Sequence, residues 1–435
     1  MNKATKIDKN ASSLVYYRLL KIIIVGSYIP LGIFSFSTLI TPLDIIYMFS
    51  LLFLVIYSKN ISLFKLKYVS TILLSFGLYI LLRFLLQNYV KGQSEIFPVF
   101  TFINPIILLY LFAQINEFTY LFKLFNFLIL ILTISMLIGV FGSLIGEPFA
   151  SIRIFLAKNE HWKYFGRGDK LVGLDETIFG FGYTVGFLPL LLFIKYHFTK
   201  NQIYIYIIVL SILAIWLNGE RSTLLFSMIF FNIFTYSQYK SKMLSVIIKT
   251  VLFAVLLFSL YLSFSQEIVE TGVDRLLKTT WVEDGRRLHK QLIGFNIIIN
   301  DPLTGGNIQT YEKDYYYKYG NYPSSTHNSY INVGMYAGVF GWLFLLITLV
   351  SLYKILLVVY KAEDNPELKF FFFGVILSFL IPMSNATLHN AGIFTSEKST
   401  WLLLGFLISR YVNFSIYKKF GTESIESNIF IAPAH

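Results

Sequence analysis

The stretch Ser329–Tyr360, SYINVGMYAGVFGWLFLLITLVSLYKILLVVY, decides the fold. It is apolar over more length than a hydrocarbon core of about 30 Å requires, so it predicts a membrane-spanning helix. Three glycines fall at spacings of four and three within it: Gly334, Gly338 and Gly341. We expect them to keep one face of the helix narrow. The polar run Pro323–Asn328 comes directly before the stretch, so the sequence sets the ionisable His327 where a loop meets a span, a position suited to proton transfer.

The composition of the whole chain agrees with a membrane protein. Hydrophobic residues make up 56% of 435 residues, which excludes an ordinary soluble protein. Apolar windows of about 20 residues recur along nearly the whole length, and they are continuous rather than alternating, which favours helices over a β-barrel. We therefore predict an all-α integral membrane protein with about twelve transmembrane helices. The expected spans are 19–36, 42–57, 68–87, 97–114, 121–145, 177–195, 202–217, 222–237, 246–264, 330–358, 369–387 and 399–417.

The formal charge of +12 is largely a signal of membrane topology. More than half of the 36 Lys and Arg residues fall on the side of the two termini, mostly in short loops and tails. Short basic loops mark the cytoplasmic side, so we expect cytoplasmic termini and no nucleic-acid partner. The chain has no cysteine, which excludes disulfides, thiolate metal ligands and cysteine nucleophiles.

Three regions follow from this topology: an amino-terminal bundle of about six helices (1–204), a region with one large outward loop (205–417, loop 265–329) and a cytoplasmic tail (418–435). Loops as long as 265–329 are usually functional or disordered. Residues 273–299 have apolar side chains at helical spacing and stop at Asp301-Pro302, so we predict a helix near the membrane surface.

Arginines on the outward side are candidate ligands for a diphosphate. Arg221 lies at the turn between the seventh and eighth expected spans, and Arg286-Arg287 open the predicted loop helix. A guanidinium is always charged and binds phosphate oxygens in pairs, which suits this role. Two alternatives stay open. In one, Arg221 only reaches toward lipid headgroups beside Glu220; in the other, Arg286-Arg287 form a solvated charge pair with Asp284.

Other outward residues complete the candidate site. His327 is the expected base, although an imidazole bound to a backbone carbonyl is the plain alternative. Asn328, Glu220 and His389 are candidates for supporting roles. Five tyrosines of the loop are expected to bind glycan, or else form an interfacial aromatic belt: Tyr311, Tyr315, Tyr316, Tyr317 and Tyr319. No P-loop, HExxH motif or metal-ligand cluster is present in the sequence, so we expect no cofactor and no metal.

Three motifs, in the same order, resemble those of the O-antigen ligase and polymerase family of bacterial envelope enzymes. His327-Asn328, nine residues and then Gly338-Val339-Phe340-Gly341 is similar to the family's His-Asn/Ser/Gln-x9-Gly-x-x-Gly signature. Arg221-Ser222-Thr223-Leu224-Leu225 resembles its Arg-x-x-x-Leu segment, and Arg287 followed by Pro302-Leu303-Thr304-Gly305-Gly306 resembles its Arg…Pro-Leu-x-Gly-x-Gly segment. The resemblance covers about residues 205–415, with Gln291 and Asn307 as departures.

The resemblance implies a glycosyltransferase of the C type in the bacterial inner membrane, metal-independent and with its active site on the periplasmic face. Its donor and acceptor would be oligosaccharides on undecaprenyl diphosphate. It implies that Arg221 and Arg287 hold the donor diphosphate and that His327 activates the acceptor hydroxyl, with inversion at the anomeric carbon.

An O-antigen or related surface-polysaccharide polymerase is the leading hypothesis. The alternative in the same family is the ligase that transfers finished glycan to lipid A–core. Membrane lipids, a chain-length regulator and a flippase are the expected partners. A flippase or exporter of lipid-linked oligosaccharide is the alternative of another class, but it would require polar residues deep in the bundle, and carboxylates are almost absent from the spans.

Overall fold

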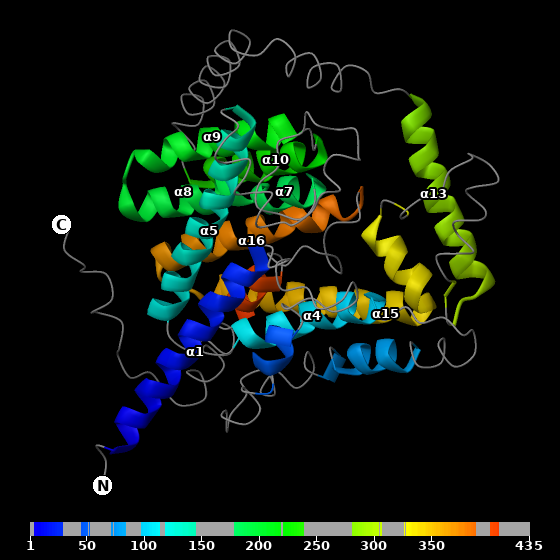
Figure 1. The fold of residues 1–435 in the computed structure, drawn as a ribbon, viewed down its shortest axis with the longest axis horizontal. Coiled ribbons are helices and arrows are strands. Elements are labelled where there is room, and N and C mark those ends of the chain that lie inside the picture. The colour runs from blue at the N-terminus through cyan, green and yellow to red at the C-terminus, as the bar shows by residue number, and fades with distance from the viewer. Residues whose placement is uncertain are drawn as a thin grey trace.

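The structure, a computed structural model, describes residues 4–28, 45–50, 52, 71–72, 74–83, 97–113, 118–144, 178–218, 221–238, 281–303, 305–306, 326, 328–388 and 401–408. Every regular element in these ranges is a helix (Figure 1), which confirms the predicted all-α class for this part of the chain. The labelled helices are α1 (Ala4–Tyr28), α4 (Phe97–Phe112), α5 (Phe118–Leu144), α7 (Ile178–Val185), α8 (Leu188–Thr199), α9 (Ile203–Asn218), α10 (Arg221–Gln238), α13 (Trp281–Asn300), α15 (Ser329–Ala362) and α16 (Pro366–Asn385).

Among the described helices, four are long and apolar enough to cross a membrane: Tyr120–Phe141, Phe181–Thr199, Ser329–Ala362 and Pro366–Asn385. All four coincide with predicted spans. The shorter apolar helices Leu74–Arg83, Ile203–Trp216 and Ser222–Ser237 fall within three more, and the span predicted at 246–264 lies outside the described residues. The chain is therefore a helical membrane protein, while the total of about twelve spans stays a prediction.

The core of the bundle is formed by aromatic side chains around α16. A Cβ on Gly374 of α16 would lie 2.5 Å from Ile194 of α8 and 2.8 Å from Phe234 of α10, so the glycine permits a close approach to both helices. On the same helix the Phe371 ring meets the Phe125 ring of α5 edge to face, with 4.9 Å between centroids. These contacts make α16 the helix against which α5, α8 and α10 pack.

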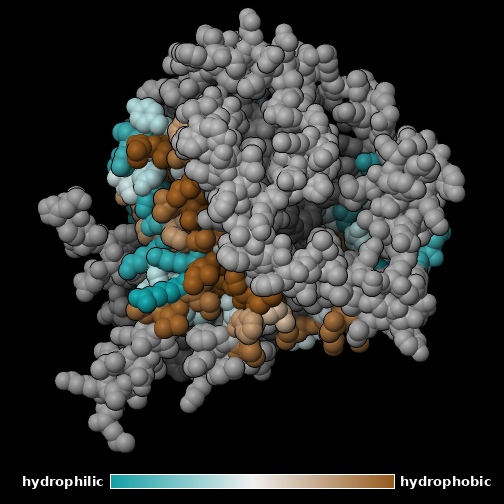
Figure 2. Space-filling view, in the orientation of Figure 1, coloured by the Kyte–Doolittle hydropathy of each residue, from teal (hydrophilic) through white to brown (hydrophobic). Residues whose placement is uncertain are grey.

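The outer surface of the described helices carries many apolar side chains. Figure 2 shows them as a band of brown, hydrophobic residues across the described part of this face. On α15, for example, Leu346 is 60% exposed and Tyr353 is 58% exposed. A surface of this kind suits contact with lipid tails.

The predicted loop helix exists, and it is α13. It ends at Asn300, directly before the predicted Asp301-Pro302 stop, and residues 273–280 lie outside the described part of the chain. One face packs against α15 through buried isoleucines, including Ile293 and Ile297. The opposite face exposes four apolar side chains at helical spacing: Leu288, Leu292, Phe295 and Ile299. An apolar face left uncovered in this way supports a position at the membrane surface.

The expectation of one continuous span with a narrow glycine face is wrong at Gly338. This residue has φ 66° and ψ −168°, so it interrupts α15 and divides it into two segments, 329–337 and 339–362. Trp342 Nε1 donates a hydrogen bond to the Tyr330 carbonyl at 2.6 Å, although residues twelve apart in a straight helix are separated by about 18 Å. The first segment therefore folds back against the start of the second, and the bend is visible in Figure 1.

The turn that follows α13 fills the break in α15. The Val339 N–H donates to the Pro302 carbonyl at 2.8 Å, and a Cβ on Gly338 would lie 2.5 Å from that same oxygen. Gly305 adopts φ +68°, and its own Cβ would lie 2.2 Å from the Met335 carbonyl oxygen. The two glycine motifs of the sequence thus form one contact, in which the backbone of the turn meets the backbone of the break.

Replacing Gly338 by alanine is expected to destabilise the protein by about 1–3 kcal/mol, because this backbone region is nearly restricted to glycine and the added methyl group meets a carbonyl. Thermal unfolding in detergent measures the effect. Gly77→Ala is the matched control, since a Cβ there would meet only Ile106 Cδ1, at an ordinary 3.8 Å. Equal unfolding temperatures for the two variants would contradict the break.

Candidate functional site

Several of the predicted site residues lie outside the described part of the chain: His327, Glu220, His389, Tyr311, Tyr315, Tyr316, Tyr317 and Tyr319. Arg221 is described as the first residue of α10, and Arg286 and Arg287 lie in the second turn of α13 rather than opening it, with only their backbone described. Asn328 is fully described. The structure therefore gives the contacts of Asn328 and of residues close in sequence to the other predicted site residues.

Asn328 fixes the start of α15. Its Oδ1 accepts hydrogen bonds from the N–H groups of Tyr330 at 3.0 Å and Ile331 at 3.1 Å, which makes it the N-cap of the helix. Its Nδ2 donates to the Thr387 carbonyl at 3.0 Å, and the Ser329 N–H donates to the Ala386 carbonyl at 2.8 Å. The residue that follows His327 is therefore bound to the end of α16. The supporting role expected for Asn328 rests on these contacts.

Thr326 fixes the chain on the other side of residue 327. Its hydroxyl lies 2.6 Å from Asn332 Oδ1, so it is tied to the first turn of α15. The side chain is fully buried, and a Cβ on Gly294 of α13 would lie 2.8 Å from its methyl carbon. The chain is thus held against α13 before residue 327 and against α16 after it.

The end of α16 also holds the start of α10. Asn385 Nδ2 donates to the Thr223 hydroxyl at 3.0 Å, and both side chains are fully buried. Thr223 also packs on the bend between α7 and α8, where a Cβ on Gly186 would meet its methyl group at 2.2 Å. Because Thr223 comes two residues after Arg221, the first turn of α10 is locked to the helix end that also holds Asn328.

Four elements therefore meet at one corner of the molecule: the start of α10, the end of α16, the start of α15 and the middle of α13. Figure 1 shows the first segment of α15 beside the end of α16, with α13 on the same side. Arg287 precedes Gly294 by seven residues, two turns or about 10 Å along α13. The corner joins the elements that carry the predicted site residues, whereas the convergence of their side chains stays a prediction.

Two residues beside the turn after α13 and the break in α15 were missed by sequence reasoning. The Tyr79 hydroxyl lies within hydrogen-bond distance of carbonyls in the turn after α13 and in α15. Arg83, on the same helix, is only 7% exposed, and its electrostatic neighbours include Asp301 and Tyr336. An arginine within the apolar stretch 68–87 was a signal that could have been used, because a charge in a span usually has a role.

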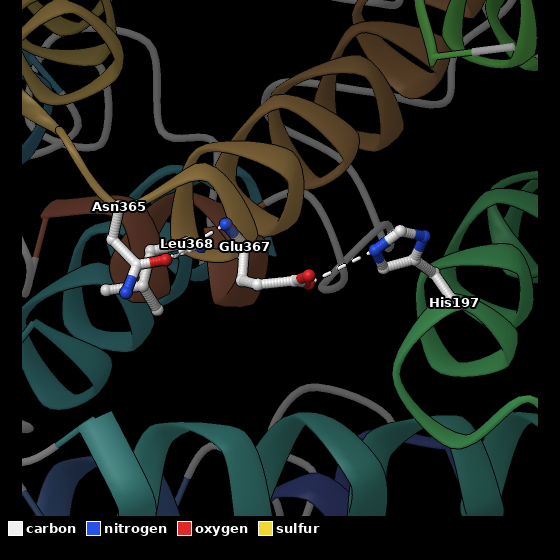
Figure 3. Close-up of polar contacts among 4 residues, drawn as sticks. All are labelled: His197, Asn365, Glu367 and Leu368. Carbon is white, nitrogen blue, oxygen red and sulfur yellow. Dashed lines mark hydrogen bonds and ion pairs between the residues drawn. The ribbon is translucent and has the colours of Figure 1, made fainter. Parts of the chain in front are cut away.

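The hydrogen bond between His197 and Glu367 drawn in Figure 3 belongs to the opposite end of α16. His197 Nε2 lies 3.1 Å from Glu367 Oε2, and the imidazole stacks on Phe370 with 3.8 Å between centroids. Asn365 caps this end by accepting from the Glu367 N–H at 2.9 Å. The 20 residues of α16 separate this pair from Asn385 by about 30 Å, so it anchors the helix away from the candidate site.

Among the residues described, no group of three or more His, Cys, Asp and Glu side chains could hold a metal ion. The role of the predicted arginines as ligands of an anionic substrate stays a prediction.

Thr223→Val is expected to lower the free energy of unfolding by about 1–3 kcal/mol, since it leaves the buried Asn385 amide without its acceptor. Thr235→Val is the control on the same helix. The Thr235 hydroxyl donates only to its own helix, to the Phe231 carbonyl at 3.0 Å and the Asn232 carbonyl at 3.1 Å. Denaturant or thermal unfolding in detergent compares them. A control loss as large as that of Thr223→Val would show that the α10–α16 bond contributes nothing of its own.

Comparison with known proteins supports the resemblance noted in the sequence. Residues 206–346, roughly a third of the chain, match the family model described as O-Antigen ligase. No curated protein matches the chain. The matched region contains α10, α13, the turn that follows α13, Asn328 and the break in α15, whereas α16, the fourth element of the corner, lies outside it. This match shows that residues 206–346 are similar to the O-antigen ligase family and agrees with the resemblance carried by the three motifs.

Proposed function

We propose that this protein is a surface-polysaccharide polymerase of the bacterial inner membrane. It transfers a growing glycan from undecaprenyl diphosphate to the non-reducing end of a lipid-linked repeat unit at the periplasmic face. The observation that carries the proposal is the corner where α10, α13, α15 and α16 meet. Within it, the hydrogen bonds of Thr223 with Asn385 and of Asn328 with Thr387 tie together the neighbours of Arg221 and His327.

In this mechanism the acceptor hydroxyl oxygen attacks the anomeric carbon as the bond from that carbon to the diphosphate breaks. His327 takes the hydroxyl proton, which is worth about 10²–10⁴-fold in rate. Arg221 and Arg287 stabilise the negative charge that develops on the leaving lipid diphosphate, so that no divalent metal is required. Arg286 and the loop tyrosines contact the donor and its glycan.

The placement of the two glycans matters as much as the acid–base chemistry. Both substrates are lipid-anchored and enter from the bilayer, so their reacting groups meet at the depth of the headgroups. Holding them in line provides much of the rate, since fixing the relative orientation of two reactants can remove about 7–11 kcal/mol of barrier. The exposed apolar face of α13 supports a site built at this lipid boundary.

The second candidate function is ligation of finished glycan to lipid A–core. The printed description of the matched family, O-Antigen ligase, favours it, and the same donor arginines and the same base serve both reactions. The acceptor distinguishes the two activities.

Reconstitution with lipid-linked repeat units alone tests the proposal. We expect a ladder of chain lengths on a gel, unaffected by EDTA, and a loss of about 10²–10⁴-fold in rate in the His327→Ala variant. Transfer that requires added lipid A–core would identify a ligase instead. A ladder of unchanged intensity from His327→Ala would show that His327 is not the base. Activity lost in EDTA and restored by Mg²⁺ would show that arginines alone do not bind the diphosphate.

Arg221→Lys and Arg287→Lys are each expected to lower kcat about 10²-fold, because lysine keeps the charge but cannot bind two phosphate oxygens in a planar fork. The same polymerisation assay measures kcat. Arg18→Lys on α1 is the matched control, since this arginine is exposed and far along the chain from the corner. Full activity in either site variant would show that the substituted arginine is an interfacial residue and does not bind the diphosphate.

A further inference from the structure

The Tyr79 hydroxyl joins two elements of the candidate site. It lies 2.9 Å from the Leu303 carbonyl oxygen, in the turn after α13, and 2.6 Å from the Ala337 carbonyl oxygen, in the first segment of α15. These partners are 224 and 258 residues away in sequence. Tyr79 belongs to the amino-terminal half of the chain, outside the region that matches the family model.

The break in α15 explains why a hydroxyl is needed here. Ala337 is the last residue of the first segment, and carbonyls at a helix end lack their usual partner in the next turn. The Val339 N–H, on the other side of the break, is satisfied by the Pro302 carbonyl. Tyr79 provides one hydroxyl proton for the carbonyl side, and its oxygen lies closer to the Ala337 carbonyl than to the Leu303 carbonyl. The backbone groups on both sides of the break are therefore satisfied by groups from outside α15.

The helix that carries Tyr79 is well placed to hold this hydroxyl. In Figure 1 it runs in blue beside α15. The Tyr79 ring packs against Phe344 with 5.7 Å between centroids and against Phe340 with 6.2 Å, and the Phe76 ring also lies 6.1 Å from Phe344. Arg83, four residues after Tyr79, interacts electrostatically with Asp301 at the start of the same turn. The helix thus contacts both the turn and the break.

We propose that Tyr79 is a positioning residue for glycan transfer, supplied by the amino-terminal bundle; this inference rests on the proposed function. Its hydroxyl holds the turn after α13 and the first segment of α15 in one arrangement. Two predicted site residues depend on that arrangement. Arg287 lies on α13, and His327 comes directly before Asn328, which caps the first segment of α15. A segment of nine residues is too short to keep a helical direction by itself, so its orientation depends on what holds its two ends.

The test is Tyr79→Phe, which removes only the hydroxyl and keeps the ring contacts. We expect kcat to fall about 10- to 100-fold, as for a small misplacement of reacting groups, with KM for the lipid-linked donor changed less than about two-fold. Tyr16→Phe is the matched control, because the Tyr16 hydroxyl also donates to a distant backbone carbonyl, that of Leu111, but between α1 and α4. It should keep wild-type kcat.

Two further readouts separate positioning from general destabilisation. Donor-binding stoichiometry should stay at the wild-type level in Tyr79→Phe, so that the loss of kcat belongs to folded, binding-competent protein. Amide hydrogen exchange should become faster in peptides that cover residues 301–306 and 329–339, and stay unchanged in α8 and α16. Together with a reduced kcat, these results support the proposal.

Wild-type kcat in folded Tyr79→Phe overturns the inference, as does an equal loss in Tyr16→Phe accompanied by lost donor binding. Neither result affects the proposed function, which fails if the wild-type protein forms no polymer from lipid-linked repeat units. In that event the kinetic inference fails with it, whereas unchanged exchange in residues 301–306 and 329–339 would separately refute the contact between turn and break.

Discussion

The contact between the turn at 302–305 and the break at Gly338 is the constraint on which the rest of the site depends. Each side presents bare backbone to the other, and each has a glycine at positive φ where a side chain would collide with a carbonyl. A backbone contact of this kind leaves little freedom of adjustment, because no rotamer can change to relieve a mismatch. It fixes the direction of residues 329–337 relative to α13, and with it the position of Asn328 at the start of that segment.

The second constraint is α16, which is held at both ends. At one end the His197–Glu367 pair and the Asn365 cap fasten it to α8 and to its own first turn. At the other, Asn385 and the carbonyls of Ala386 and Thr387 bind α10 and α15. Between them the helix is embedded in phenylalanine side chains. Through these hydrogen bonds, the end of α16 fixes the start of α10 relative to the start of α15.

Sequence reasoning predicted the helical class and the similarity of residues 206–346 to the O-antigen ligase family, because these follow from apolar windows and short motifs. It did not predict the break in α15. Gly334, Gly338 and Gly341 have the spacing of a helix-packing face, and nothing local distinguishes the one that leaves the helix. Tyr79 was beyond reach for another reason: its partners are backbone carbonyls more than 200 residues away, and a carbonyl carries no sequence signature. Arg83, in contrast, was visible as a charge in an apolar run.

The division of α15 also has a consequence for the lipid bilayer. Residues 339–362 form a helical segment about 36 Å long, slightly more than the thickness of a hydrocarbon core. Hydrophobic matching between this segment and the surrounding acyl chains therefore sets the depth of the break, and with it the depth of the corner. Thicker or thinner membranes would tilt the segment or deform the bilayer around it, at a modest energetic cost per ångström of mismatch. The length of residues 339–362 thus determines how far the break lies from the opposite surface of the bilayer.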